Sequence, residues 1–187
     1  MAKKKSSLRI IGGDWRSRKI KFANNVIIRP TPDRIRETLF NWLSNKVAQA
    51  ECLDLFAGSG ALGFEAASRG AKHVTMVDAD TIIADMLIEQ KKSFAAQQVD
   101  VVHQDALAYL QHANKKFDIV FLDPPFNSEL LQHAVTTLNS RELLEASGLI
   151  YVESSIHFVQ PQCLNAFTCI REKSAGQVRY ALYEALN

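Results

Sequence analysis

The sequence predicts an α/β fold in which helices cover both faces of a mostly parallel β-sheet and an antiparallel hairpin closes its carboxyl end. From about residue 51, short apolar and β-branched runs alternate with helical stretches, and these runs are too apolar for a sheet with one solvent face. Near the end of the chain, two strand-like runs flank Gly176, which suits a hairpin turn. A small β-hairpin extension at the amino end completes the predicted fold.

The first element is an arm at residues 1–32, ahead of a main domain at 33–187. Runs at 8–11 and 18–22 alternate imperfectly around a Gly-Gly-Asp turn, which favours the small hairpin. Two prolines keep the segment Arg29-Pro-Thr-Pro-Asp33 extended, and Asp33 is then expected to cap a helix that continues to about Lys46.

The main domain follows as alternating strands and helices. The predicted strands are 51–56, 73–78, 99–103, 117–122 and 148–153, and the predicted helices lie near 60–69, 80–96, 105–112 and 128–146. The closing hairpin is formed by Phe167 to Arg171 and Val178 to Glu184.

Length and composition exclude several classes of protein. A chain of 187 residues buries enough surface to fold without disulfides or a structural metal, and 47% hydrophobic residues exclude a disordered or collagen-like chain. No apolar run approaches the roughly 18 residues of a membrane span, and no apolar segment follows the basic start as in a secretory signal. Three cysteines without CxxC spacing favour a reduced, cytoplasmic protein, and five histidines show no metal-ligand spacing.

The net charge of +2 is the sum of a strongly basic amino-terminal segment and an acidic remainder. Residues 1–36 carry eleven Lys and Arg against two Asp, a charge of +9, whereas the remainder carries eleven basic and eighteen acidic residues, a charge of −7. This asymmetry predicts an arm that binds nucleic acid. A merely solvating tail is the alternative, and it is favoured for Lys3 to Lys5 taken alone.

A glycine-rich loop follows the first strand of the main domain. Gly58, Gly60 and Gly63 form GxGxxG between a strand and a helix, where glycines permit a tight turn and close approach of a ligand. Asp78 ends the next strand, 20 residues after Gly58, where a carboxylate can accept both hydroxyls of a ribose. The pattern predicts a site for a nucleoside cofactor.

The acids around this loop favour a cationic cofactor. Asp54, four residues before Gly58, would repel the pyrophosphate of a dinucleotide but attract the ammonium and sulfonium groups of S-adenosylmethionine. Alternatively, Asp54 accepts hydrogen bonds from loop amides, and both roles are compatible. Asp105 follows the third strand, where it either accepts from the adenine amine or caps the next helix.

The turn Asp123-Pro124-Pro125-Phe126 follows the fourth strand and should face the same crevice. The prolines remove two N–H donors and leave acceptors, the Asp123 carboxylate and a proline carbonyl, with the Phe126 ring beside them. These acceptors would hold both hydrogens of an exocyclic amine while the ring stacks on the base. The amine would then attack the sulfonium methyl in line, with catalysis mainly by positioning. A rigid structural turn is the alternative.

The combination of 54–60, Asp78, Asp105 and 123–126 resembles class I S-adenosylmethionine-dependent methyltransferases of the amino-methylating branch. More closely, the chain is similar to the RsmD family of 16S rRNA guanine-N2 methyltransferases over nearly its whole length. The core motifs also occur in DNA adenine and cytosine enzymes, whereas Arg9-Ile-Ile-Gly-Gly-Asp-Trp-Arg16 and the segment 29–40 are more specific. The family often has glycine in place of Ser17 and threonine or another residue in place of Pro32, changes expected to spare the chemistry.

The resemblance implies a Rossmann-like class I methyltransferase fold with a seven-stranded sheet. It implies that S-adenosylmethionine contacts Asp54, Phe56, Ala57, Gly58, Ser59, Gly60, Asp78, Asp105 and Ala106, and that residues 123–126 hold a target guanine that is flipped out or lies in a loop. The implied RNA contacts are Arg9, Arg16, Arg18 and Lys19, with Arg16 and Arg18 foremost. Arg29, Thr31 and Arg34 would lie near the mouth of the site, unless they serve only helix capping and surface charge.

The implied partner is 16S rRNA in a partly assembled small ribosomal subunit, acted on by a monomer without a metal or a membrane anchor. Three alternatives remain: an amino-methyltransferase of DNA or another RNA, an NAD-dependent oxidoreductase suggested by GxGxxG with Asp78, and a non-catalytic RNA-binding factor.

Overall fold

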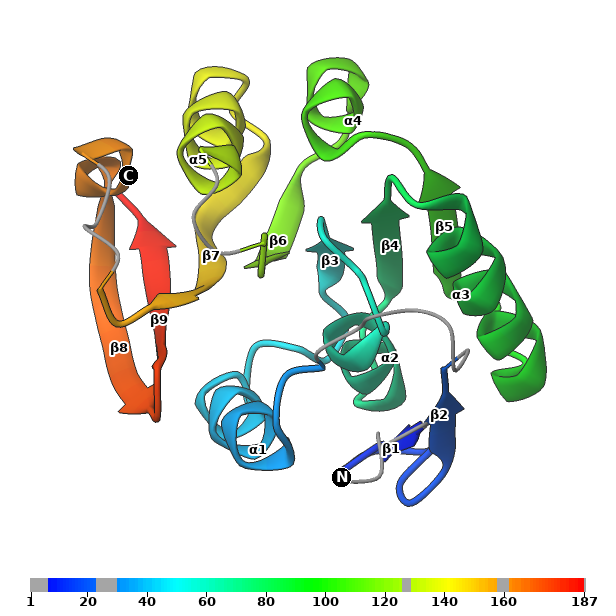
Figure 1. The fold of residues 1–187 in the computed structure, drawn as a ribbon. Helices are drawn as coiled ribbons and strands as arrows, with labels where there is room; N and C mark the ends of the chain where they lie inside the picture. Colours follow the sequence, from blue (N-terminus) through cyan, green and yellow to red (C-terminus); the bar gives the residue numbers. More distant parts are fainter. Residues whose placement is uncertain (1–6, 23–29, 126–128, 158–161, 187) are drawn as a thin grey trace.

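Seven strands form one sheet in the computed structural model, which describes residues 7–22, 30–125, 129–157 and 162–186 (Figure 1). The strand order is β5-β4-β3-β6-β7-β9-β8. The strands are β3 (Glu51–Asp54), β4 (His73–Asp78), β5 (Val99–His103), β6 (Phe117–Leu122), β7 (Leu144–Ser155), β8 (Phe167–Ala175) and β9 (Val178–Ala185). β3 to β7 pair in parallel, and β9 runs antiparallel to both β7 and β8. The predicted fold class is confirmed.

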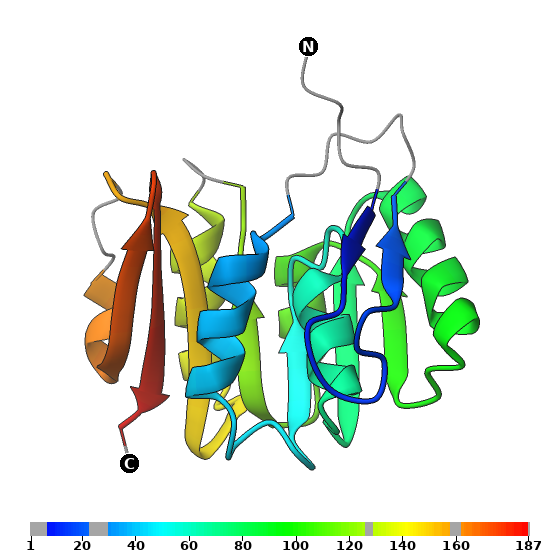
Figure 2. The same cartoon turned by 90° about the horizontal axis from the view of Figure 1, so that it is seen from below.

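Helices cover both faces of this sheet (Figure 2). One face carries α1 (Asp33–Trp42), α2 (Ala61–Ser68) and α3 (Thr81–Phe94), and the other carries α4 (Ala106–His112), α5 (Leu130–Ser140) and the short helix η1 (Gln162–Ala166). None of these helices, within the described part of the chain, is long and apolar enough to cross a membrane.

Side chains of the central strands alternate between two apolar layers. On β7, Leu149 and Tyr151 pack toward α1 and α2, whereas Ile150 and Val152 pack toward α4 and α5. The period of two in a strand therefore buries consecutive residues on opposite faces, which explains the continuous apolar runs of the sequence.

Three predictions about the ends of helices are wrong. The stretch 128–146 is not one helix, because α5 ends at Ser140 and β7 begins at Leu144, with Glu142 at a positive φ of 51° between them. The sequence 141–146 lacks glycine and proline and contains good helix formers, so local propensity concealed the break. Likewise α1 ends at Trp42, and Pro32 rather than Asp33 occupies its N-cap.

The amino-terminal hairpin, β1 (Ser7–Arg9) and β2 (Lys19–Lys21), packs on α2 and α3. Its apolar side chains Leu8, Ile10 and Ile20 are buried in the layer shared with α1 and α2. At the hairpin turn, Gly13 has a φ of 75°, and a Cβ there would lie 1.8 Å from the Ser68 carbonyl oxygen. Ser17 has a φ of 69°, a conformation in which glycine is less strained.

The Glu65 carboxylate of α2 connects the arm, α1 and α2. It is fully buried and accepts from the backbone N–H groups of Ile11 and Gly12, each at 2.8 Å. It also accepts from the buried guanidinium of Arg36 at 3.3 Å and from Arg69 at 2.8 Å. Arg36 in turn donates to the Arg9 carbonyl oxygen at 2.8 Å. Two charges and two backbone donors are thus satisfied around one carboxylate.

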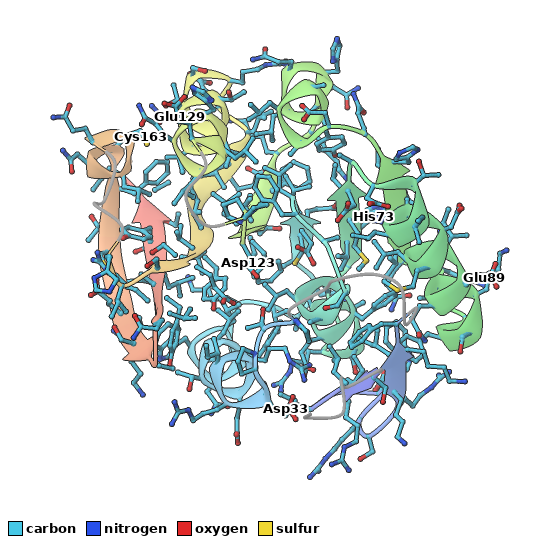
Figure 3. All side chains as sticks on the ribbon, viewed as in Figure 1. Asp33, His73, Glu89, Asp123, Glu129 and Cys163 are labelled. Atoms are coloured by element: carbon cyan, nitrogen blue, oxygen red, sulfur yellow. The ribbon has the colours of Figure 1, made fainter. Side chains whose placement is uncertain are left out.

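We expect Glu65→Ala to lower the free energy of unfolding by about 3–5 kcal/mol. The variant removes the buried partner of Arg36, which keeps its ion pair with the exposed carboxylate of Asp33, and it leaves two backbone N–H groups without their acceptor. Urea denaturation measures this change. The matched control is Glu89→Ala on the outer surface of α3, where the carboxylate pairs only with exposed Lys92 (Figure 3). Similar losses in both variants would contradict the role assigned to Glu65.

Candidate functional site

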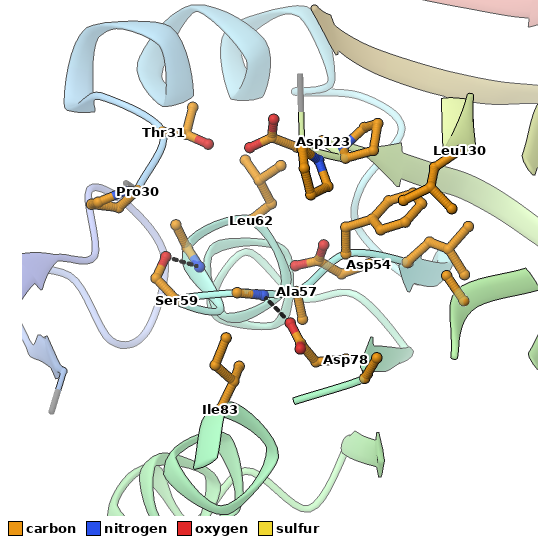
Figure 4. Close-up of a pocket in the computed structure, with 18 of the residues that line it drawn as sticks. Pro30, Thr31, Asp54, Ala57, Ser59, Leu62, Asp78, Ile83, Asp123 and Leu130 are labelled. Atoms are coloured by element: carbon orange, nitrogen blue, oxygen red, sulfur yellow. Dashed lines mark hydrogen bonds between the residues drawn. The ribbon is translucent and has the colours of Figure 1, made fainter. Parts of the chain in front are cut away.

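A pocket of about 490 Å³ opens at the carboxyl end of the parallel strands, where the predicted acids converge (Figure 4). Asp54, Asp78 and Asp123 end or follow β3, β4 and β6, and Asp105 follows β5. Because parallel strands end at one edge of the sheet, four side chains distant in the sequence line one cavity. The remaining lining is mainly apolar and includes Leu55, Phe56, Ala57, Gly58, Ser59, Ala61, Leu62, Ala79, Ile83, Ala106 and Leu130.

The glycine loop connects β3 to α2 along one wall of the pocket. Gly58 and Gly60 have positive φ values of 50° and 74°, and the N–H of Gly60 donates to the Ala57 carbonyl at 2.7 Å. A Cβ on Gly60 would lie 2.7 Å from the Phe64 ring, and one on Gly63 would lie 2.8 Å from Met76. Gly60 does not itself line the pocket, so the structure accounts for it by turn geometry and packing.

Asp78 fixes the loop through hydrogen bonds. One carboxylate oxygen accepts from the Gly58 N–H at 2.9 Å, and the other accepts from the Asp80 N–H at 3.0 Å. The side chain is half-buried and faces the pocket. Each oxygen retains a further lone pair, so Asp78 can accept from a ligand while it holds the loop.

Asp54 is the most buried of the four acids, with 2% of its surface exposed. It accepts from the Gly63 N–H at 2.9 Å and also lines the pocket, so the predicted hydrogen bond to a loop amide is present. Burial raises the pKa of Asp54 to about 7, helped by the nearby Asp123 and Asp78 carboxylates and opposed by the Gly63 hydrogen bond. This crowding of negative charge favours a cationic ligand.

Asp105 occupies the N-cap of α4, where its carboxylate accepts from the Ala108 N–H at 2.9 Å. The helix-capping role is therefore confirmed. Asp105 also lines the pocket beside Ala106, so its second predicted role, contact with an adenine amine, remains geometrically open as a prediction.

The proline turn forms the opposite wall. Asp123, Pro124 and Pro125 line the pocket, while Phe126 lies outside the described residues. Figure 4 places the Asp123 carboxylate and the Thr31 side chain on the same side of the cavity, above Asp54. The Asp123 turn, which can accept hydrogen bonds from an amine, and the acids that suit a cationic ligand therefore line the same pocket.

The residues predicted to contact RNA lie on different elements of the structure. Thr31 is buried and lines the pocket with Pro30, and exposed Arg34 lies in the first turn of α1. Arg9 and Lys19 are exposed and pair across the hairpin. Arg29 lies outside the described residues.

Arg16 and Arg18 are not brought to the pocket. The hairpin turn contacts Ser68 at the end of α2, whereas the pocket is lined by Ala61 and Leu62 at the start of that helix. Eight helical residues separate these ends by about 12 Å. Arg18 donates to the Ser93 carbonyl oxygen at 2.6 Å, with its guanidinium carbon 4.4 Å from the centre of the Phe94 ring, so it also supports the packing of the arm.

The sequence interpretation missed several residues around the site. Leu62, Ile83 and Leu130 line the pocket from the first turns of α2, α3 and α5, and their only signal was their place just after a strand end. Buried Glu153 of β7, whose carboxylate accepts from the Tyr151 hydroxyl at 2.9 Å, was also missed, although it is the last residue of the predicted strand 148–153 and so carried the same signal as the other acids. No group of three His, Cys, Asp or Glu side chains within the described ranges could hold a metal ion.

Comparisons with known proteins agree with this architecture. The family described as Conserved hypothetical protein 95 matches residues 8–184. Ribosomal RNA small subunit methyltransferase D of Escherichia coli K12 is 43% identical over 177 residues, covering 95% of this chain and 89% of the relative. The solved yhhF protein of Escherichia coli, named as a candidate methyltransferase, is 42% identical with a TM-score of 0.86, covering 96% of this chain and 98% of that chain.

A more distant structure shares the fold alone. The 16S rRNA N2 G1207 methyltransferase RsmC of Thermus thermophilus, solved with AdoMet and guanosine, is 20% identical with a TM-score of 0.74, covering 96% of this chain and 50% of that chain. The family match and the identity to the Escherichia coli relative confirm the resemblance seen in the motifs: the chain belongs to the Conserved hypothetical protein 95 family, which is the RsmD family of methyltransferases.

Proposed function

We propose that this protein transfers a methyl group from S-adenosylmethionine to the exocyclic N2 amine of a guanine in 16S rRNA, within a partly assembled small ribosomal subunit. The observation that carries the proposal is the Asp123 turn, which faces the same pocket as the acids that end β3 and β4 and the acid that follows β5. The names of full-length relatives, which specify ribosomal RNA of the small subunit, support this class of substrate.

The cofactor is S-adenosylmethionine because the pocket is acidic and has an ordinary size for a small-molecule site. Asp54 suits the cationic end of the molecule, Asp78 the ribose hydroxyls, and Asp105 with Ala106 the adenine. A dinucleotide would place its pyrophosphate beside Asp54 and Asp78, where like charges repel. This argument disfavours the NAD-dependent oxidoreductase, and calorimetry with NADH and S-adenosylmethionine compares the two cofactors directly.

Transfer requires a correctly placed amine more than a strong base. The N2 lone pair forms the new N–C bond as the S–CH3 bond breaks, and the bonding pair remains on sulfur as a neutral thioether. The amine then loses one proton, which Asp123 accepts and passes to water. By accepting from the amine before attack, Asp123 and the carbonyl oxygen of Pro124 orient the lone pair toward the methyl group.

The basic arm supplies the electrostatic contact with RNA. Arg9, Lys19 and Arg16 are exposed, and exposed Arg34 lies beside the pocket-lining Thr31. A guanine amine stacked in a helix cannot reach the Asp123 turn, so the target base lies in a loop or is flipped out. Mass spectrometry of 16S rRNA from a strain lacking this chain tests the function: N2-methylguanosine disappears at one site, whereas an unchanged content at every site would refute the proposal.

The pH dependence of cofactor affinity tests Asp54. Because the pKa of Asp54 is raised to about 7, the ionised form that attracts a cation is lost as the pH falls below 7. We expect the affinity for S-adenosylmethionine, measured by calorimetry, to fall up to roughly tenfold per pH unit below that value. Asp54→Asn should bind weakly without this dependence, and Asp85→Asn on the exposed face of α3 should behave as the wild type.

Substitution of Asp123 tests the turn. Asp123→Asn replaces one of the two carboxylate acceptors by a donor, so we expect the single-turnover rate on small-subunit RNA to fall roughly 10²–10³-fold. Cofactor affinity should change by only a few fold, because Asp78 and Asp105 remain. A rate equal to that of the wild type would remove this carboxylate from the mechanism.

Salt dependence tests the arm. Replacing exposed Arg9 and Lys19 together by Ala should reduce the slope of log affinity against log salt by about 2, while S-adenosylmethionine affinity stays constant. Lys116→Ala with Lys173→Ala, two exposed lysines on other elements, provides the control. Equal slopes for the arm variant and the wild type would show that these side chains do not contact phosphates.

A further inference from the structure

A second carboxyl group lies behind the Asp123 turn, outside the lining of the pocket. Glu153 belongs to β7 and is only 3% exposed. β6 and β7 are parallel, with Leu122 opposite Val152, so the next residues, Asp123 and Glu153, follow at the same level of neighbouring strands. Strand alternation places Glu153 on the same face as Tyr151, which packs toward α1.

The groups that face Glu153 are hydroxyls and acids. The Tyr151 hydroxyl donates to its carboxyl oxygen at 2.9 Å, and the Thr31 side chain forms a second hydrogen bond from the segment that enters α1. Asp123 and Asp54 contribute negative charge from β6 and β3, and Tyr180 lies opposite on β9. None of the ion pairs found within the described residues includes Glu153 or Asp54.

This setting decides which carboxyl group carries a proton. Two carboxylates on adjacent strands repel each other, and burial penalises the charged form further. Glu153 is buried, whereas Asp123 is half-buried and borders the pocket. Burial and the neighbouring Asp123 raise the pKa of Glu153 to about 8, although the hydrogen bonds from Tyr151 and Thr31 oppose the shift. The greater burial of Glu153 therefore favours a proton on this side chain rather than on the half-buried Asp123.

We propose that Glu153 is a positioning residue for methyl transfer, which holds a proton so that Asp123 remains the ionised acceptor, and which ties the Thr31 segment to the catalytic turn. The proposal rests on the proposed function, because the acceptor role of Asp123 belongs to it. The amine proton passes to Asp123 and then to water, so the proton on Glu153 is not consumed. Ionisation of Glu153 would place two charges at one level of the sheet and displace Asp123 from the amine.

Three variants separate positioning from mere packing. Glu153→Gln is a neutral isostere that keeps an acceptor for Tyr151, Glu153→Ala removes the contacts, and Glu145→Gln on the exposed start of β7 is the control. The first measurement is a carboxyl-carbon NMR titration of the folded protein, with the Glu153 signal assigned by its loss in Glu153→Gln. The second is the single-turnover rate of methyl transfer to small-subunit RNA between pH 6 and pH 9.5.

We expect the Glu153 carbon to titrate near pH 8, and the wild-type rate to decline above that pH. Glu153→Gln should keep the rate within about threefold at pH 7 and lose the decline, and Glu145→Gln should match the wild type throughout. Glu153→Ala, checked for folding by circular dichroism, should lose roughly 10²-fold in rate with little change in cofactor affinity, as expected when a reacting group is misplaced.

The outcomes distinguish this inference from the function on which it rests. Titration of Glu153 near its ordinary value, or a rate decline that persists in Glu153→Gln, overturns the inference while methylation by the wild type stands. Absence of N2-methylguanosine from the wild-type reaction, with Glu153 still titrating near pH 8, refutes the proposed function and the positioning role of Glu153 together. The protonation state itself would then stand as a property of the fold.

Discussion

The contacts of the buried Glu65 carboxylate fix the two segments that form opposite walls of the pocket, the glycine loop and the segment that contains Thr31. It holds the backbone of the arm at Ile11 and Gly12, and it pairs with Arg36 of α1. α2 begins where the glycine loop ends, and α1 begins just after pocket-lining Thr31. A single buried charge in α2 therefore sets the position of the loop relative to the segment opposite it. A buried ion pair costs desolvation energy, which the four hydrogen bonds around Glu65 offset.

The same logic of buried charge explains how the site separates its acids by role. Asp78 and Asp105 accept backbone N–H groups and retain lone pairs toward the pocket. Asp54 is buried and sits with a pKa near 7, so a cation in the pocket would favour its ionised form. Glu153 is buried without access to the pocket and keeps its proton at neutral pH. Side chains with the same carboxyl group thus differ in protonation because they differ in burial and in the charges and hydrogen bonds around them.

How much of this was predictable from the sequence depends on whether a residue ends a strand. Asp54, Asp78, Asp105 and Asp123 were predicted because the carboxyl ends of parallel strands share one edge. Glu153 carried the same signal, because it ends the predicted strand 148–153, but no glycine or proline turn follows it to mark a site. Glu65 carries no such signal, since it lies inside a helix that is buried throughout. Their importance comes from partners 29 to 122 residues away, such as Arg36 for Glu65 and Thr31 for Glu153. Contacts of this kind follow from the three-dimensional packing, which local patterns do not encode.

The separation between the hairpin turn and the pocket assigns different tasks to the arm and the catalytic turn. The hairpin turn that carries Arg16 contacts Ser68 at one end of α2, and the glycine loop lies at the other end, about 12 Å away along the helix, so we expect a phosphate on Arg16 to lie outside the target nucleotide. Under the proposed function, the arm holds RNA that flanks the target, which fixes orientation without reading a base. In the proposed mechanism, recognition of the amine falls to Asp123, which Glu153 and Thr31 are proposed to position. We therefore expect loss of arm charge to weaken RNA binding, and loss of the carboxyl pair to slow the chemical step after binding.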